Sequence, residues 1–310
     1  MSDYTAIIPV AGKGLRLLPY TAHMPKTMLC VAGRPIIAHI LEQIEQCGIK
    51  KVVFVVGYQK QVLMDYAQKH YAHLHIEFVE QKEPKGLGHA IYQAKEFVKG
   101  PCLIVLGDTI IDGNLRPLVQ SGKNCVGVKE VEDPRRFGVV QIQDNCIVDM
   151  EEKPENPKSN IALIGAYSFL DSQQLFDAIE KVISSGKTVK NEIQLTDALA
   201  LLLKQAVCIT PVFMTNWYDC GTVEVLLHTN QILLEKKSYV PEKFLKNNKI
   251  IAPCWIDDSA IVENCVLGPN VSVAEGAVLK NNVIENSIIS ADTYLLDKKQ
   301  SHKIFDKYNC

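Results

Sequence analysis

The sequence TAIIPVAGKG, which runs from Thr5 to Gly14, places a short apolar strand directly before a loop with two glycines. A strand followed by a loop and then by a helical pattern is the repeating unit of folds built on a mostly parallel sheet. Two glycines separated by one residue let backbone amides approach a phosphate that larger side chains would block. On these features alone, a flexible surface loop is an equally good interpretation.

Short apolar runs continue to alternate with helical patterns up to about residue 235. Pro35 opens a helix whose apolar residues share one face, and Gly48 closes it. Further strands are predicted at 51–56, 76–80, 102–106 and 125–128, with helices near 60–70 and 89–98. Runs at 137–143 and 146–151 predict a hairpin, and a strand at 161–170 follows. The prediction is an α/β fold with a Rossmann-like, doubly wound mixed sheet, in which ligands bind at the carboxyl ends of the strands.

The spacing of apolar residues changes after about residue 235. Beyond a polar linker at 236–252, small or apolar residues recur every six positions, as in the row Ala260, Val266, Ser272, Val278 and Ile284. A six-residue period is typical of a parallel β-helix, although ordinary short strands are the alternative. Residues 253–292 would form about two 18-residue coils, fewer than the ~3 units that usually stand alone. The β-helix should therefore pack against the main domain or against another subunit. Residues 293–310 are expected to form a tail.

Composition excludes several classes of protein. With 47% hydrophobic and 22% charged residues, the chain is globular and not disordered. A net charge of -2 argues against a general binder of nucleic acid or membrane surfaces, which would carry a basic excess. No apolar run approaches the ~18 residues of a membrane helix, and the first residues do not resemble a signal peptide. We expect a cytoplasmic protein without a nucleic-acid or membrane partner.

The cysteines support that location. Cys102, Cys125, Cys208 and Cys265 are scattered through apolar runs, without the close pairs of a zinc site or a disulfide-rich mini-domain. Nearly all of the 10 cysteines are therefore interpreted as reduced core residues.

The residues after the glycine loop strengthen the phosphate interpretation. Arg16 and Lys26 add two cations within fifteen residues of the loop, a combination that suits a polyphosphate. A nicotinamide-binding loop would need a third glycine where this chain has Leu17, and no Walker-type Gly-Lys-Ser/Thr is present.

The run Gly12-x-Gly14-x-Arg16-Leu17-x-Pro19, followed by Pro25-Lys26, resembles the signature of the sugar-phosphate nucleotidylyltransferases. Later segments match the same family in the same order: Gln81 with Gly86-Leu87-Gly88-His89-Ala90, Leu106-Gly107-Asp108, Arg136-Phe137-Gly138-Val139, Glu151-Glu152-Lys153-Pro154, Gly165-Ala166-Tyr167, Leu195-Thr196-Asp197 and Trp217-Tyr218-Asp219-Cys220-Gly221-Thr222. The resemblance makes residues 1–235 a nucleotidylyltransferase domain. It is nearest to the longer glucose-1-phosphate thymidylyltransferases, which end in a left-handed hexapeptide β-helix, while uridylyltransferases acting on glucose 1-phosphate share the stretch from Gly86 to Ala90.

In that family a sugar 1-phosphate oxygen attacks the α-phosphorus of a nucleoside triphosphate, and pyrophosphate leaves. Such chemistry depends on positioning and charge neutralisation, and needs no nucleophilic side chain. The resemblance implies that Arg16, Lys26, Asp108, Lys153 and Asp219 are catalytic. Asp108 and Asp219 would hold Mg²⁺, a hard cation that prefers carboxylate and phosphate oxygens.

The resemblance also implies the binding residues. The triphosphate would lie against the backbone of Ala11, Gly12, Lys13 and Gly14, and the base against Gln81 and Gly86. The amide of Gln81 would offer a donor and an acceptor to the imide edge of uracil or thymine, so that dTTP and UTP both fit. The sugar phosphate would contact Gly138, Glu152, Lys153, Leu163, Gly165 and Trp217.

Some features leave alternatives open. Leu15 stands where the family often has a small hydroxyl residue, which puts one phosphate contact in doubt. A regulatory member of the fold without turnover is one alternative, which the intact charged residues oppose. An acyltransferase is another, which the short repeat without a histidine opposes. We expect the repeat to serve oligomerisation or regulation in a homo-oligomer.

Overall fold

The computed structural model describes residues 4–189 and 191–309. The chain divides into two compact units, and each is described by itself. Unit 1 consists of Met1–Lys13 and Ile40–Trp217, and unit 2 of Gly14–His39 and Tyr218–Cys310. The two units do not follow the order of the sequence, because the glycine loop and the residues after it group with the C-terminal part of the chain.

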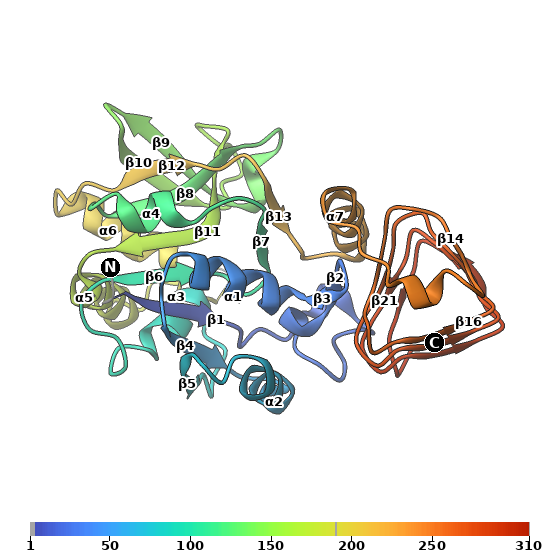
Figure 1. Cartoon of the computed structure of the whole chain (residues 1–310). Helices are drawn as coiled ribbons and strands as arrows, with labels where there is room; N and C mark the ends of the chain where they lie inside the picture. Colours follow the sequence, from blue (N-terminus) through green and yellow to red (C-terminus); the bar gives the residue numbers. More distant parts are fainter. Residues whose placement is uncertain (1–3, 190, 310) are drawn as a thin grey trace. The chain divides into compact units, whose positions relative to one another are not determined.

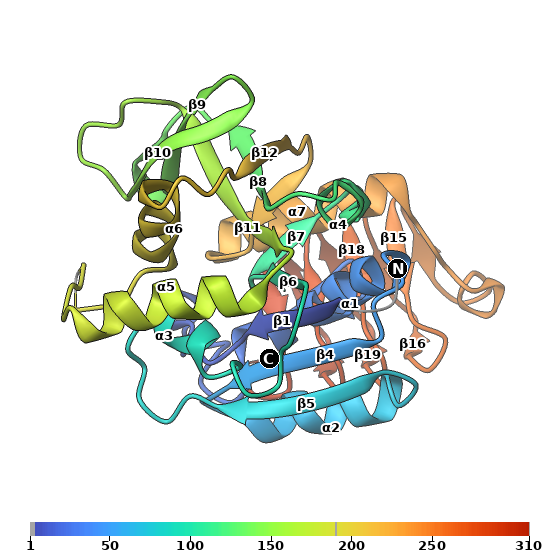
Figure 2. The same cartoon turned by 90° about the vertical axis from the view of Figure 1, so that its left-hand side faces the viewer.

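Unit 1 is built on a mixed sheet with the strand order β10-β9-β11-β6-β1-β4-β5 (Figure 2). The parallel strands are β1 (Thr5–Pro9), β4 (Lys51–Val56), β5 (His75–Glu80) and β6 (Cys102–Val105). The antiparallel part contains β8 (Cys125–Glu130), β9 (Gly138–Gln143), β10 (Cys146–Glu152) and β11 (Ile161–Phe169), with β12 (Thr210–Phe213) beside β8. The doubly wound mixed sheet and its hairpin are therefore confirmed.

Both faces of the sheet are covered. Ile7 and Val53 pack in one apolar core with residues of the helices α3 (Leu87–Tyr92), α5 (Ser172–Ser184) and α6 (Leu195–Lys204). Their neighbours Ile8 and Phe54 point to the opposite face and are also fully buried. Strands buried on both faces read as continuous apolar runs, which explains the Val- and Ile-rich sequence.

The remaining helices and short strands connect the sheet. They are α1 (Ile36–Gln46), α2 (Lys60–His70), α4 (Arg116–Gln120), the 3₁₀ turn η3 (Pro134–Arg136), β7 (Thr109–Ile111) and β13 (Trp217–Asp219). The helix expected near 89–98 ends at Tyr92, because the next residues bond to the carbonyl three positions back, as Gln93 N does to Ala90 O and Lys95 N to Tyr92 O.

Unit 2 contains a parallel β-helix with three faces, whose coils stack from orange to red in Figure 1. Its first face holds β14 (Lys249–Ile250), β17 (Val266–Leu267), β20 (Val283–Glu285) and β23 (Lys299–Ser301). The second holds β15 (Cys254–Ile256), β18 (Val271–Val273), β21 (Ile288–Ile289) and β24 (Ile304–Phe305), and the third β16 (Ile261–Glu263), β19 (Val278–Lys280) and β22 (Tyr294–Leu296).

The β-helix is longer than the hexapeptide pattern indicated. Paired strands are 17 residues apart at Lys249↔Val266 and 16 apart at Ile288↔Ile304, not 18. Residues expected to form a tail instead contribute Leu295, Ile304 and Phe305 to the buried interior. The linker expected at 236–252 contains η4 (Glu242–Phe244) and β14, which pairs with β17.

The corners of the β-helix are held by ladders of asparagine. Asn264 Nδ2 donates to Asn281 Oδ1 at 2.9 Å, and Asn281 Nδ2 donates to Asp297 Oδ1 at 3.0 Å. All three residues have a positive φ, a backbone conformation that Asn and Asp tolerate better than most residues. The coil-to-coil turns therefore stack in register.

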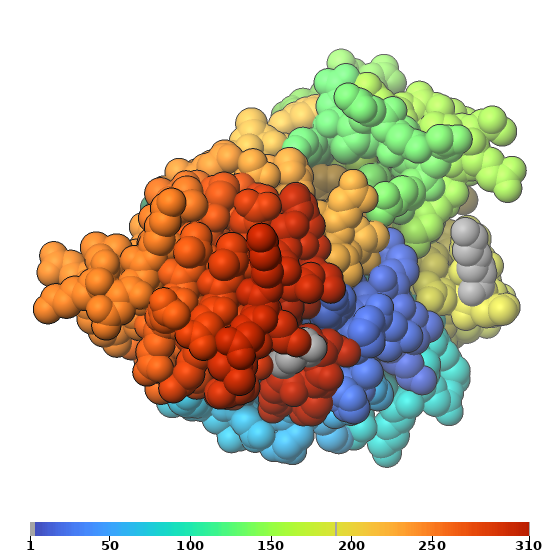
Figure 3. Space-filling view, turned by 90° about the vertical axis from the view of Figure 1, so that its right-hand side faces the viewer, coloured from blue at the N-terminus to red at the C-terminus, as the bar shows by residue number. Residues whose placement is uncertain are grey.

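The N-terminal segment of unit 2 packs on this β-helix. It includes η1 (Leu15–Leu17), η2 (Lys26–Met28) and the docking hairpin, formed by β2 (Cys30–Val31) and β3 (Arg34–Pro35). Strand β2 contacts both β21 and the helix α7 (Val223–Lys236). Figure 3 shows this blue segment beside the red C-terminal residues.

Named contacts bind the segment to each part of unit 2. Ala32 N donates to Asn230 Oδ1 at 2.8 Å in a buried bond, and Asn230 Nδ2 donates to Asn270 O at 3.1 Å. Further along, the rings of His23 and Tyr308 lie 4.3 Å apart. The segment is therefore an integral part of the unit that contains the β-helix.

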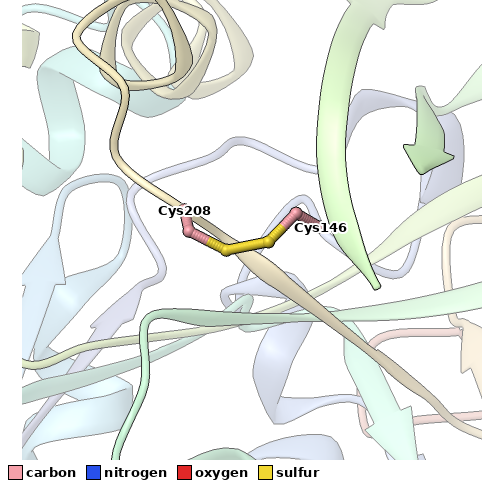
Figure 4. The surroundings of a disulfide bond; sticks show 2 residues. All are labelled: Cys146 and Cys208. Atoms are coloured by element: carbon pink, nitrogen blue, oxygen red, sulfur yellow. A yellow bond between two sulfur atoms is a disulfide. The ribbon is translucent and has the colours of Figure 1, made fainter. Parts of the chain in front are cut away.

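The expectation that nearly all cysteines are reduced is corrected at one pair. Cys146 and Cys208 form a disulfide, with a Cα–Cα distance of 6.0 Å (Figure 4). Ile147 N donates to Ile209 O at 2.9 Å, which brings the two segments side by side. A separation of 62 residues hides this proximity from any spacing rule. Within the described residues, Cys102, Cys125 and Cys265 are free and buried, as expected.

Across the described part of the chain, every helix is too short or too polar to cross a bilayer.

Candidate functional site

Asp108 lies in a tight turn between β6 and β7. Leu106 N donates to Gly165 O at 2.9 Å, and Thr109 N donates to Leu106 O at 3.1 Å. Gly165 has φ +81°, and a Cβ there would lie 2.8 Å from Leu106 Cδ1. A side chain at 165 would therefore push against the turn that holds Asp108 at the carboxyl end of β6.

Glu152 is the centre of a polar cluster beside this turn. It pairs with Gly138 across the hairpin, and Thr196 Oγ1 donates to Glu152 Oε2 at 2.6 Å. A Cβ on Gly138 would lie 2.9 Å from Leu163 Cδ1 and 3.2 Å from Glu152 Oε2. The structure thus brings the predicted Gly138, Glu152 and Leu163 together, and adds Thr196.

Lys153 and Tyr167 extend the cluster. Lys153 has φ +45°, and its Nζ lies 3.1 Å from Glu152 Oε1. Burial raises the pKa of the Tyr167 phenol, and the carboxylates of Glu152 and Asp108 raise it further. Asp108 and Glu152 therefore both act on one buried hydroxyl, which stays protonated at neutral pH.

Trp217 forms an aromatic wall with Phe137. The two ring centroids are 4.9 Å apart in an edge-to-face arrangement. The indole Nε1 of Trp217 is buried and has no hydrogen-bond partner among the described residues. A buried donor without a partner is costly, and a ligand that accepts from it would remove that cost.

Gln81 lies where β5 ends, and its side chain is held by the Gly86 loop. The Gln81 Nε2 group donates to Gly86 O at 3.2 Å and lies 3.0 Å from His89 Nδ1. Gly86 has φ +98°, and a Cβ there would lie 2.7 Å from Ile193 O. Only glycine fits this position, since both its backbone conformation and its close neighbour exclude a side chain.

The loop after β1 crosses from one unit to the other along the chain. In unit 1, a Cβ on Gly57 would lie 2.9 Å from Ala11 O, whereas one on Gly12 would meet nothing within 4 Å. In unit 2, Gly14 has φ +63°, and Thr21 Oγ1 donates to its carbonyl oxygen at 2.9 Å. The Gly12 backbone is therefore open to a ligand, while Gly14 makes the turn.

Arg16, Asp219 and Lys26 belong to unit 2. A Cβ on Gly221 would lie 2.7 Å from Arg16 Nη2 and 3.1 Å from Asp219 Oδ1, so the guanidinium and the carboxylate both border this glycine. Lys26 Cβ lies 3.1 Å from the position of a Cβ on Gly14. Arg16 and Lys26 thus lie on the N-terminal segment of unit 2, which packs on the β-helix.

The predicted site residues are divided between the units. Unit 1 contains Ala11, Gly12, Lys13, Gln81, Gly86, Asp108, Gly138, Glu152, Lys153, Leu163, Gly165 and Trp217, and unit 2 contains Gly14, Arg16, Lys26 and Asp219. Sequence reasoning assigned no role to His89, Thr196 and Gly221. All three stand inside the matched motifs, and that is the signal that could have identified them.

The side chains of the predicted site residues indicate which metal ion they could bind. No three His, Cys, Asp or Glu side chains of residues 4–189 and 191–309 gather as a metal site. Asp108 in unit 1 and Asp219 in unit 2, which the sequence resemblance implies as metal ligands, each carry carboxylate oxygens. Such oxygens suit Mg²⁺ when phosphate oxygens and water complete its shell.

The mixed sheet with helices on both faces, and with a glycine loop after its strand β1, defines a Rossmann-like α/β protein. Residues 5–236 match the family described as Nucleotidyl transferase, and the chain belongs to that family.

Individual relatives agree with the family. The chain is 37% identical over 258 residues to the "Bifunctional protein GlmU" of Methanocaldococcus jannaschii, covering 83% of this chain and 61% of that protein. It is 31% identical over 246 residues to "UTP--glucose-1-phosphate uridylyltransferase AglF" of Haloferax volcanii, covering 76% of this chain and 99% of that protein.

A solved structure of UDP-glucose pyrophosphorylase complexed with UDP-glucose is similar, with a TM-score of 0.66 and 29% identity. The similarity covers 76% of this chain and 99% of that one. The chain spans 61% and 62% of the length of two GlmU relatives, which are therefore longer than this sequence.

Proposed function

We propose that the protein transfers a nucleotidyl group from UTP or dTTP to glucose 1-phosphate, giving the nucleotide sugar and pyrophosphate. The observation that supports it most is the cluster of Gly138, Glu152, Lys153 and Leu163, which joins a carboxylate, an ammonium group and a glycine without room for a side chain. These are the groups that a sugar phosphate needs, since its hydroxyls donate to a carboxylate and its phosphate pairs with a cation.

In the proposed reaction, an oxygen of the sugar 1-phosphate forms a bond to the α-phosphorus, and the bond from that phosphorus to the bridging oxygen of the β-phosphate breaks. The electron pair leaves with pyrophosphate. Lys26 would neutralise the α-phosphate, Arg16 the departing pyrophosphate, and Lys153 the phosphate of the sugar. The backbone of Ala11, Gly12, Lys13 and Gly14 would bind the triphosphate.

Mg²⁺, held by Asp108 and Asp219, would supply charge neutralisation for the phosphates when it is bound. Glu152 would accept from sugar hydroxyls while Thr196 keeps its carboxylate in place. The backbone at Gly165 and the indole of Trp217 would complete the sugar site. Trp217 Nε1, which is buried without a partner among the described residues, is the donor that a sugar oxygen would satisfy.

Relatives are named for each of the two nucleotides, and one similar solved structure is of a "Putative Glucose-1-Phosphate Thymidylyltransferase from Bacillus anthracis", with a TM-score of 0.67 and 29% identity. AglF is named for UTP and glucose 1-phosphate, and the similar pyrophosphorylase structure contains UDP-glucose. Uracil and thymine present the same imide edge to Gln81, so the side chain alone does not separate them. A glucose-1-phosphate thymidylyltransferase is the second candidate, because the sequence motifs resemble the long form of that enzyme.

Pyrophosphate release tests the proposal. Purified protein with Mg²⁺ and glucose 1-phosphate should release pyrophosphate with UTP or dTTP, and much less with ATP, GTP or CTP. If no pyrophosphate is released with any nucleotide and any sugar phosphate, the result would favour a regulatory member of the fold without turnover.

Asp108→Asn tests the metal assignment. The substitution should lower kcat at least ~10²-fold, the loss expected when one electrostatic element is removed from a preorganised site. Asp144→Asn is the matched control, since Asp144 lies in an exposed hairpin turn at φ +49°, which Asn also tolerates. Full activity of Asp108→Asn would refute the role of Asp108.

Homo-oligomerisation through the β-helix stays a prediction. Comparing the size in solution and the kinetics of the full chain with those of a chain that lacks residues 250–310 would test it. Unchanged size and kinetics would contradict it.

A further inference from the structure

His89 lies in the first turn of α3, three residues after Gly86, and its ring lies beside Gln81, the residue proposed to bind the base. Gly86 O is a carbonyl and can only accept, so the NH₂ group of Gln81 must point toward it. The same nitrogen lies 3.0 Å from His89 Nδ1. His89 Nδ1 therefore has to be the acceptor of the second amide hydrogen.

The orientation of Gln81 is thus decided by its surroundings. Both hydrogens of its NH₂ group are used inside the protein, one by Gly86 O and one by His89 Nδ1. The carbonyl Oε1 accepts from none of the described residues, and it is not among their buried, unpartnered atoms. Gln81 is 8% exposed, so this oxygen is the polar atom that it offers to a ligand.

A second amide competes for the same ring. Gln93 Nε2 lies 3.2 Å from His89 Nε2, and a neutral imidazole accepts on only one nitrogen. Gln81 is buried, so its second amide hydrogen would have no partner if His89 Nδ1 did not accept it, and a buried donor without a partner is costly. Gln93 Nε2 also donates to His89 O at 3.2 Å, but Gln93 is half-buried, so water can replace this bond when its amide turns. The ring therefore keeps its proton on Nε2 and accepts from Gln81 on Nδ1.

We propose that His89 is a positioning residue for base selection: it fixes the Gln81 amide so that only its carbonyl oxygen faces the base. Uracil and thymine carry a hydrogen on N3 and can donate to this oxygen. Cytosine has an unprotonated N3 in the same position, so that two acceptors would meet. The inference rests on the proposed function, and it replaces the expectation that Gln81 offers both a donor and an acceptor.

The matched variants are His89→Leu and His89→Asn. Leucine places a methyl group where Nδ1 stands and accepts nothing, whereas asparagine places its Oδ1 there and still accepts. In His89→Leu, the preference for UTP over CTP, as a ratio of kcat/KM values, should fall about five- to tenfold, the factor that one net hydrogen bond supplies. His89→Asn should retain most of the preference.

A merely structural role would change both nucleotides alike and leave the ratio unaltered. His75→Leu is the control, because His75 is an exposed histidine on β5. An unaltered ratio in His89→Leu with UTP turnover present would overturn the inference and leave the proposed function standing. Binding of UTP and CTP can also be measured by calorimetry without glucose 1-phosphate. Selective binding of UTP without turnover would contradict the proposed function and leave the inference about His89 standing.

A direct measurement does not depend on any variant. Nitrogen-15 NMR of histidine-labelled protein should show the His89 ring neutral, with its proton on Nε2. A proton on Nδ1 would overturn the inference, because that nitrogen could not accept from Gln81.

Discussion

Gly221 shows how a single residue sets the spacing of charged groups in unit 2. Any side chain there would meet Arg16 Nη2 at 2.7 Å. Because that atom ends a flexible side chain, Gly221→Ala should leave the melting temperature nearly unchanged and displace the guanidinium. Misplacing a group by about 1 Å can lower a rate about 10²-fold, so we expect kcat/KM for UTP to fall between ~10-fold and ~10²-fold. Pyrophosphate-release kinetics measure this.

Gly113→Ala is the matched control for that substitution, since a Cβ at Gly113 would meet nothing within 4 Å. It should change neither kinetics nor melting temperature. Equal kinetics for Gly221→Ala and Gly113→Ala would show that Arg16 does not depend on the space at Gly221.

His89 also makes base selection depend on pH. Burial lowers the pKa of His89, the cation of Lys85 lowers it further, and Glu83 opposes them in part. The ring is therefore neutral above the usual imidazole value of about 6.5 and gains a proton only below it. Protonated Nδ1 can no longer accept from Gln81. The UTP-to-CTP ratio should be constant from about pH 8 to about pH 6.5 and fall toward about pH 5.

The lowered pKa of His89 also makes the stability of the folded protein depend on pH. Because the pKa of His89 is lower in the folded than in the unfolded protein, the unfolded state binds more protons between the two values, and this group's contribution to the free energy of unfolding falls as the pH falls. His89→Asn removes the titrating group, so its UTP-to-CTP ratio should stay flat over the whole range. A wild-type ratio that also stays flat would contradict the prediction.

Among the elements, the hairpin of β9 and β10 gains a covalent tie to the segment before β12. The Cys146–Cys208 disulfide closes 62 residues of chain, which in the chain-entropy description stabilises the fold by about 4 kcal/mol. Cys208→Ser should therefore lower the melting temperature in the absence of reductant. With a strong reductant present, wild type and variant should melt together. Identical melting under both conditions would mean that the pair is not bonded in the protein.

Elements with strong local patterns were predictable from the sequence. The strand from Lys51 to Val56 and the helix from Lys60 to His70 were both anticipated, because apolar periodicity marks them without reference to distant residues. The last coil of the β-helix was not, since 296–305 departs from the hexapeptide pattern and its interior is recognised only from the buried Leu295, Ile304 and Phe305. The disulfide was not either, because no local signal links Cys146 to Cys208.

The site shows the same division. Motif order identified which residues to examine, but not the contacts between them. Tertiary packing places Gly221 beside Arg16, Thr196 beside Glu152 and His89 beside Gln81. The order of the motifs does not indicate these contacts. A linear reading also suggested one transferase domain ending near residue 235, whereas the residues around Arg16 and Lys26 group with the β-helix.

For the whole molecule, this grouping predicts what a shorter chain would lose. Gly33 lies against Trp255, with room for no side chain, since a Cβ would lie 2.0 Å from Trp255 Cδ1. A chain that ends at Lys236 lacks that surface and the Tyr308 ring. We expect residues 14–35 to be cut faster by protease and the KM for UTP to rise, because the loop with Arg16 and Lys26 has lost its support.

Limited proteolysis followed by mass spectrometry locates the cuts. Tyr308→Ala is the milder variant, and it should expose the part of the loop near His23 more than the docking hairpin. Equal protection of 14–35 in the full and shortened chains would show that the β-helix does not hold the loop.

The buried bond between Ala32 and Asn230 joins residues 198 positions apart. During synthesis, the segment from Gly14 to His39 leaves the ribosome before Asn230, Trp255 and Tyr308 are made. The parallel strands of unit 1 can pair while these partners are still missing, since domains fold as their residues appear. The segment from Gly14 to His39 is therefore held in the described conformation only after partners up to the β-helix have been made.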